Sequence, residues 1–133
     1  MVVGAFLSCA QALDITMIPV LNSIALQQSQ PTKKVMDKVQ QLLDYANTYQ
    51  NIFVQFYASD MQLHVDSDAT FLVLPKACSC IAGYFQLLNN KGKDDFVDNG
   101  PILIEYCTVR SVVTFVAEIE THGVFQNAKK IIL

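Results

Sequence analysis

The chain has 133 residues, which is enough for one ordinary domain or two incomplete ones. With 52% hydrophobic and 16% charged residues it is too apolar to be disordered, and its net charge of −3 argues against a general nucleic-acid binder. No apolar run reaches the roughly 20 residues that cross a bilayer, and the N-terminus lacks the features of a signal peptide. We therefore expect an intracellular protein with no membrane segment, whose four cysteines are reduced thiols.

The first 58 residues are predicted to form three helices. The apolar stretch "VVGAFLSCAQAL" predicts a short helix that ends before Asp14. "TMIPVLNSIALQQ" predicts a second helix, capped by Thr16, with Pro19 in its first turn where the missing N–H does no harm. The third helix is predicted in "QPTKKVMDKVQQLLDYANTY", with Thr32 as its N-cap.

After this helical segment the apolar period changes from helical spacing to alternation. The polar turn 89–100 separates two predicted strands and is typical of a hairpin, and a helix is predicted from Ser111 to the C-terminus, with Gly123 as its weakest point. The predicted strands cover residues 51–59, 61–68, 79–88 and 101–107. We therefore expect an α+β fold with a domain boundary near residues 58–60.

Two carboxylates occur at the end of one predicted strand. Because strand side chains alternate between faces, Asp66 and Asp68 share a face with Gln62 and His64. A single D-x-D pattern is a weak signal, and a solvated turn explains it more often than a metal site does.

A third carboxylate is singled out by helical phase. At about 100° per residue, Glu120 lies within an apolar stripe, whereas Glu118 lies on the opposite side with Ser111 and His122. The stripe consists of Val113, Val116, Ala117 and Val124. A carboxylate buried in such a stripe is costly unless it is paired or bound to a cation. We therefore expect Glu120 to point toward Asp68 and to help bind Mg²⁺, which prefers oxygen ligands.

These same residues carry a resemblance to a known family. The segments "ASDMQLHVDSDATFLVLPKACSCIAGYF" and "VVTFVAEIETHGVFQNA" closely resemble the ribonuclease H domain of copia-type retrotransposon polyproteins. In residues 1–58, "FLSCAQALDITMIPVLNSIALQQSQPT" and "LLDYANTYQN" are similar to the end of the reverse transcriptase of those polyproteins. The resemblance implies a helical segment in 1–58 and a ribonuclease H-like domain in 59–133, made of antiparallel strands and a packed helix.

The activity implied by the resemblance is hydrolysis of the RNA strand of an RNA–DNA hybrid by two-metal catalysis. The family's metal-binding catalytic residues correspond to Asp68 and Glu120, and Asp66 is a possible further ligand outside the first coordination sphere. The cofactor implied is Mg²⁺ or Mn²⁺, bound weakly if at all.

The chain also departs from the family pattern. The family has two further catalytic Asp residues downstream of the glutamate-bearing helix, and these 133 residues contain no counterpart of either. We therefore expect a truncated ribonuclease H-like domain that is inactive as an isolated chain. The alternative is a non-catalytic structural or interaction remnant with no nuclease role. An incomplete sheet also predicts self-association through an exposed edge strand.

Overall fold

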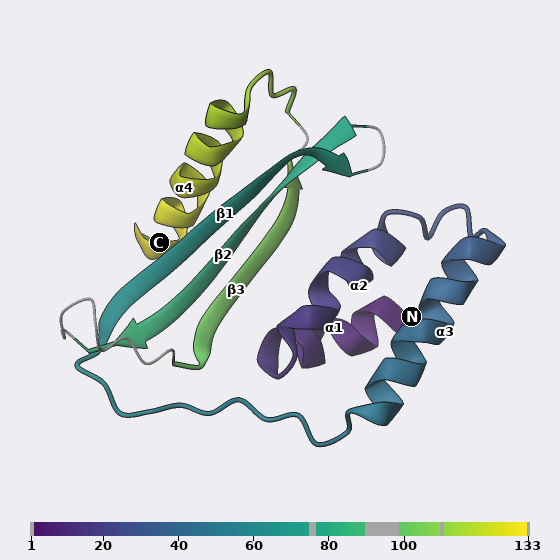
Figure 1. Cartoon of the computed structure of the whole chain (residues 1–133), viewed down its shortest axis with the longest axis horizontal. Helices are drawn as coiled ribbons and strands as arrows, with labels where there is room; N and C mark the ends of the chain where they lie inside the picture. Colours follow the sequence, from purple (N-terminus) through teal and green to yellow (C-terminus); the bar gives the residue numbers. More distant parts are fainter. Residues whose placement is uncertain (1, 75–76, 90–98, 110, 133) are drawn as a thin grey trace. The chain divides into compact units, whose positions relative to one another are not determined.

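The computed structural model describes residues 2–74, 77–89, 99–109 and 111–132. This part of the chain contains four α-helices and one three-stranded antiparallel sheet, which confirms the predicted α+β class (Figure 1). The chain divides into two compact units, 1–54 and 55–133, and each is described by itself. None of the described helices is both long enough and apolar enough to cross a membrane.

The first unit is entirely helical. Its elements are α1 (Val2–Ala12), a 3₁₀ turn (Ile15–Met17), α2 (Ile18–Ala25) and α3 (Lys33–Thr48). One face of each helix supplies the core, which is formed by Ala10, Met17, Ile18, Leu21, Ile24, Val35 and Leu42. The three helices predicted from the sequence are confirmed.

The caps of these helices agree with the prediction at one position and differ at another. Thr32 caps α3 as predicted, and its hydroxyl oxygen accepts a hydrogen bond from the Val35 amide. Thr16 is not a cap. The N-cap of α2 is Met17, which forms no side-chain cap hydrogen bond. Asp14 caps the 3₁₀ turn before α2, and its Oδ1 accepts from the Thr16 amide at 3.1 Å and from the Thr16 hydroxyl at 2.6 Å.

The second unit is built on an antiparallel sheet with the strand order β1-β2-β3. The strands are β1 (Gln62–Leu74), β2 (Cys78–Leu88) and β3 (Pro101–Val109). β1 is longer than predicted, and its pairing with β2 shifts register between Thr70 and Leu74. The antiparallel order of β2 and β3 agrees with the predicted hairpin, although residues 90–98 of its turn lie outside the described part of the chain.

The strand predicted over residues 51–59 is wrong, because this segment forms neither helix nor strand. The backbone of this segment is hydrogen-bonded to a side chain and not to a neighbouring strand. The Tyr57 amide donates to Asn99 Oδ1 at 2.8 Å, and Asn99 Nδ2 donates to the Tyr57 carbonyl at 3.0 Å. Main-chain groups that are satisfied in this way do not need a place in the sheet.

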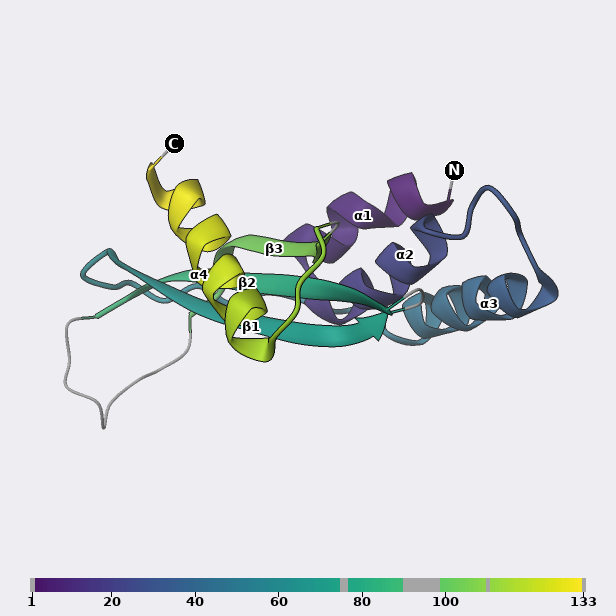
Figure 2. The ribbon, with the colours of Figure 1, turned by 90° about the horizontal axis from the view of Figure 1, so that it is seen from above.

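The last helix, α4 (Val116–Ile132), covers one face of the sheet (Figures 1 and 2). Ile119 is fully buried and packs with Ile81 of β2 and Val109 of β3. At the other end of α4, Lys130 Nζ forms an ion pair of 2.8 Å with Glu105 Oε1 of β3. A hydrophobic cluster of this unit therefore lies between α4 and one face of the sheet.

Candidate functional site

The two aspartates of β1 lie on the same face of the sheet, as the alternation predicted. Asp66 is directly opposite Tyr84 of β2, and Asp68 is directly opposite Ala82. The Asp66 carboxylate accepts a hydrogen bond of 3.2 Å from Gln86 Nε2 and lies 3.6 Å from His64 Nδ1. Asp66 and Asp68 are both exposed, so this face presents two carboxylates to solvent.

Helix α4 covers the opposite face of the sheet. Asn127 Nδ2 donates to Ser67 Oγ at 2.9 Å and to the Ala82 carbonyl at 3.0 Å. Ser67 lies between the two aspartates in β1, and alternate side chains of a strand point to opposite faces. The Asp68 side chain therefore points away from the face that α4 covers.

Glu120 does not lie in a buried stripe of α4, so this part of the sequence analysis is wrong. The buried residues of the helix are Ile119, Gly123 and Asn127, whereas Glu120 is exposed. Val116 and Val124, which were expected to be buried beside Glu120, are also exposed. Helix α4 packs on the sheet through Ile119 and through Asn127, which hydrogen-bonds to Ser67 and Ala82, and not through the more apolar stripe.

Of the two glutamates, Glu118 is the one with a defined structural role. Its Oε2 accepts hydrogen bonds from the Thr114 amide at 2.8 Å and from the Thr114 hydroxyl at 3.0 Å. These bonds stabilise the charged carboxylate and hold the pKa of Glu118 below its usual value. Glu118 thus anchors the first turn of α4, a role that the sequence analysis did not assign to it.

The predicted ligands are not brought together in this arrangement. Asp66 and Asp68 occupy one face of the sheet, and Glu120 belongs to the helix on the other face. Among the residues that the structure describes, no group of three or more His, Cys, Asp or Glu side chains could hold a metal ion. The assignment of Asp68, Glu120 and Asp66 to a Mg²⁺ or Mn²⁺ site remains a prediction.

Asn127 is the residue in this region that the sequence analysis missed. It is buried, and it connects α4 to β1 and β2 through the two hydrogen bonds of its amide nitrogen. The signal that could have found it is the four-residue spacing of Ile119, Gly123 and Asn127, which places all three on one side of a helix.

A second polar cluster lies on the face of the sheet opposite α4, around a buried thiol. Cys80 Sγ is 2.7 Å from the Thr70 hydroxyl, and all four cysteines are thiols that form no disulfide. Partial burial, followed by a hydrogen bond and electrostatic repulsion from Cys80, raises the pKa of Tyr106 to about 12. This raised pKa keeps the Tyr106 phenol neutral, so Tyr106 is not an activated nucleophile.

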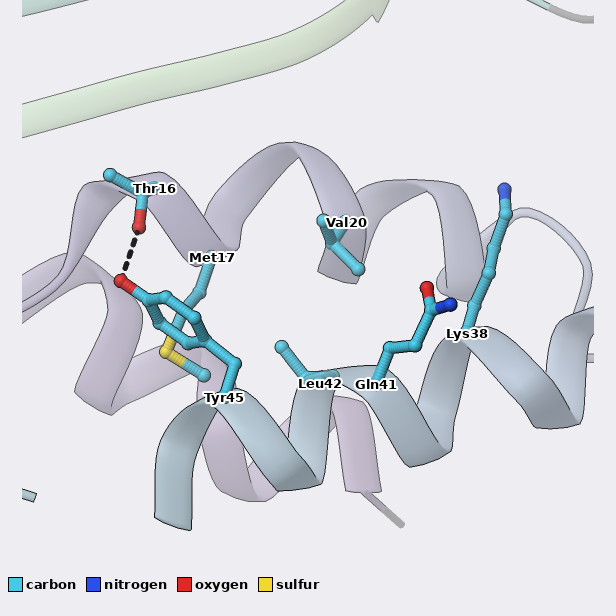
Figure 3. A pocket seen from close by; sticks show the side chains of 7 residues that line it. All are labelled: Thr16, Met17, Val20, Lys38, Gln41, Leu42 and Tyr45. Atoms are coloured by element: carbon cyan, nitrogen blue, oxygen red, sulfur yellow. Dashed lines mark hydrogen bonds between the residues drawn. The ribbon is translucent and has the colours of Figure 1, made fainter. Parts of the chain in front are cut away.

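The helical unit contains a largely apolar pocket between α2 and α3 (Figure 3). Its volume is about 300 Å³, and the Tyr45 hydroxyl at one end is 3.1 Å from Thr16 Oγ1. The lining residues are Thr16, Met17, Val20, Lys38, Gln41, Leu42 and Tyr45. Lys38 lines the pocket, and its Nζ donates a hydrogen bond to Ser23 Oγ at 2.9 Å.

Comparison with protein-family models, with curated proteins and with solved structures finds no match to this chain. The class that the structure itself defines is a mixed α+β protein, with a helical unit followed by a three-stranded antiparallel sheet and its covering helix.

Proposed function

We propose that residues 59–133 are a portion of a ribonuclease H-like domain of the copia-type retrotransposon class. The observation that carries this proposal is the hydrogen bond of 2.9 Å from Asn127 of α4 to Ser67 of β1. It joins the helix of the "AEIETHGVFQNA" segment to the strand of the "DSDAT" segment, and these are the two segments on which the resemblance rests. The element order of antiparallel strands followed by a covering helix is consistent with the same proposal.

We further propose that the chain by itself is a non-catalytic remnant and not a nuclease. Two-metal hydrolysis requires carboxylates that converge on two ions about 4 Å apart. Here Asp68 points away from the face that carries α4, and Glu120 is exposed on that helix. Any Mg²⁺ or Mn²⁺ would then be bound weakly by separate carboxylates, because exposed acids hydrated by solvent gain little from one ion.

The test is an RNA–DNA hybrid cleavage assay with the full chain in Mg²⁺ and in Mn²⁺. We expect the wild type and Asp68→Asn to show the same background rate, because no two-metal site is assembled. Cleavage by the wild type that Asp68→Asn and Glu120→Gln both abolish would show that the chain is an active nuclease. Calorimetric titration with Mn²⁺ tests metal binding separately from cleavage. A heat of binding that Asp68→Asn removes, in a chain that does not cleave the hybrid, would indicate a metal site that is not catalytic.

An interaction role is supported by the outer strands of the sheet. In the described part of the chain β1 and β3 each have a single neighbouring strand, and both expose apolar side chains. The exposed residues are Leu63, Leu72 and Val73 of β1, and Ile102 and Leu103 of β3. Outer strands of this kind can pair with another copy of the chain, so we propose self-association through a sheet edge.

A further inference from the structure

Asp14 of the helical unit is a buried acid whose hydrogen bonding is incomplete. Only 7% of its surface is exposed. Thr16 donates two hydrogen bonds to Oδ1, but Oδ2 is buried and has no hydrogen-bond partner among the described residues. A buried carboxylate oxygen without a donor is costly, and such a group is usually paired or bound to a cation.

The same residue lines a pocket of about 160 Å³ in the helical unit. Aromatic side chains form much of its wall, namely Phe6, Tyr45 and Tyr49, and the rings of the two tyrosines are 4.8 Å apart. The remaining wall is mainly apolar and includes Leu13. None of the described residues that line this pocket is a lysine, arginine or histidine, so the pocket wall supplies no cation to Asp14.

The positions of Asp14 and Tyr45 are fixed by Thr16. Its hydroxyl is 2.6 Å from Asp14 Oδ1 and 3.1 Å from the Tyr45 hydroxyl, and Figure 3 shows the second of these contacts. The carboxylate and one aromatic wall are therefore held in place before any ligand binds, which lowers the entropic cost of binding. Tyr49, at the end of α3, is more than half exposed and forms the solvent-facing part of the wall.

We propose that this pocket binds a small primary alkylammonium ion. One N–H of the ligand donates to Asp14 Oδ2, the buried oxygen that has no hydrogen-bond partner among the described residues. The aromatic rings attract the positive charge, and the alkyl chain packs on Leu13. The pocket volume equals about five water-sized volumes, which suits an alkyl chain of about four carbons.

Other ligand classes fit this pocket less well. An anion would be repelled by the carboxylate, and a divalent metal needs more oxygen ligands than one carboxylate supplies. A quaternary ammonium ion would satisfy the aromatic walls but has no N–H for Oδ2. Asp14 Oδ2 accepts no hydrogen bond from the described residues, and the wall beside it is aromatic. These two features together favour a primary alkylammonium ion.

The experiment is a titration of the full chain with n-butylammonium, followed by the amide resonances of residues 9–17 and 45–50. We expect saturable shifts, and we expect Asp14→Asn to weaken the affinity at least about tenfold, because a charge-assisted hydrogen bond is lost. Tetramethylammonium should bind more weakly than n-butylammonium to the wild type. The matched control is Asp44→Asn, an exposed acid of α3 outside this pocket, which should leave the affinity unchanged.

Equal affinities for the wild type and Asp14→Asn would overturn the proposal, and so would shifts that do not saturate. If Asp14→Asn does not fold, Tyr49→Ala provides the second variant, because its exposed position makes it a mild change for the fold. Removing this aromatic wall should also weaken n-butylammonium binding, and an unchanged affinity would contradict the assignment of the pocket. Neither result depends on whether the chain cleaves nucleic acid.

Discussion

Gly83 of β2 and Asn127 of α4 are packed against each other with no space for an additional atom. A Cβ at position 83 would lie 2.8 Å from Cγ and 2.9 Å from Nδ2 of Asn127. The same amide nitrogen donates to Ser67 Oγ and to the Ala82 carbonyl. The missing side chain of Gly83 therefore lets α4 come close enough to the sheet for Asn127 to form both hydrogen bonds.

The first prediction follows from this packing. Gly83→Ala should destabilise the protein by about 1–3 kcal/mol, because the new methyl group displaces the Asn127 amide. Chemical denaturation measures the change. Gly123→Ala is the matched control from the same interface, since its Cβ would meet Ile81 and Ser67 at 3.4 Å, an ordinary contact distance. Alanine is also the better helix former, so Gly123→Ala should raise stability by up to about 1 kcal/mol. Equal losses in both variants would argue against close packing as the cause.

The second prediction concerns the Asn127 amide. Asn127→Ala removes two hydrogen bonds from a buried site, and we expect a loss of about 1–3 kcal/mol in the free energy of unfolding. Gln126→Ala, at the neighbouring and less buried position, should change stability by less than about 0.5 kcal/mol. In the Asn127→Ala background, Gly83→Ala should lower the free energy of unfolding by less than it does in the wild type. The new methyl group then occupies the space that the Asn127 amide has left. Strictly additive effects would contradict the proposed contact.

The third prediction concerns Tyr106. Its raised pKa of about 12 means that the folded protein keeps the phenol proton at a pH where the unfolded chain loses it. The associated stability is fully present below pH 10.0 and should be lost as the pH rises from there toward 12. Tyr106→Phe has no such proton to lose, so its stability should fall less over this range. Chemical denaturation at a series of alkaline pH values tests this, and parallel pH profiles would show that Tyr106 titrates normally.

The fourth prediction concerns self-association through the sheet edge. We expect dimers or larger species at high micromolar concentration, and we expect Ile102→Lys in β3 to shift them toward the monomer, because charge on an edge strand disfavours pairing. Val112→Lys is the control, since Val112 is exposed but lies outside the sheet. Sedimentation velocity distinguishes the species. A wild type that remains monomeric, or a larger effect of Val112→Lys, would rule out the edge as the interface.

Local signals in the sequence were sufficient to predict most of the helices and strands. The Thr32 cap and the periodic apolar residues of α3 predicted that helix, and alternation predicted that Asp66 and Asp68 share a face. Alternation failed in residues 51–59, because a strand also needs a neighbour to pair with, and there the Asn99 side chain holds the Tyr57 backbone instead. No local pattern reveals a contact between residues so far apart in the chain.

The position of Glu120 could not be predicted for a related reason. A helical wheel shows which residues share a side of α4, but it does not show which side packs on the sheet. α4 has apolar residues on more than one side, so Val116 and Val124 looked like the buried stripe although they are exposed. The buried side contains Asn127, and the fit of Asn127 to the sheet depends on the distant residues Ser67 and Gly83.

The last prediction compares the two glutamates of α4, which are both exposed and differ in their contacts. Glu118 accepts two hydrogen bonds from Thr114, so Glu118→Gln should lower the stability of the protein at neutral pH by weakening these charge-assisted bonds. Glu120→Gln should leave the stability unchanged, because Glu120 is exposed and no buried apolar stripe surrounds it. The measurement is chemical denaturation of the wild type and both variants.

The pH dependence gives this prediction a second readout. The folded-state pKa of Glu118 is lowered by the Thr114 amide and then by the Thr114 hydroxyl, so its stabilising effect is present above the ordinary value of 4.5. The effect is lost as the pH falls through the lowered pKa, where the carboxyl becomes neutral and resembles glutamine. The wild type and Glu118→Gln should therefore differ at pH 7 and converge in acid, whereas the wild type and Glu120→Gln should match throughout. A pH-dependent loss in Glu120→Gln but not in Glu118→Gln would mean that α4 is turned so that Glu120 has the buried, paired position.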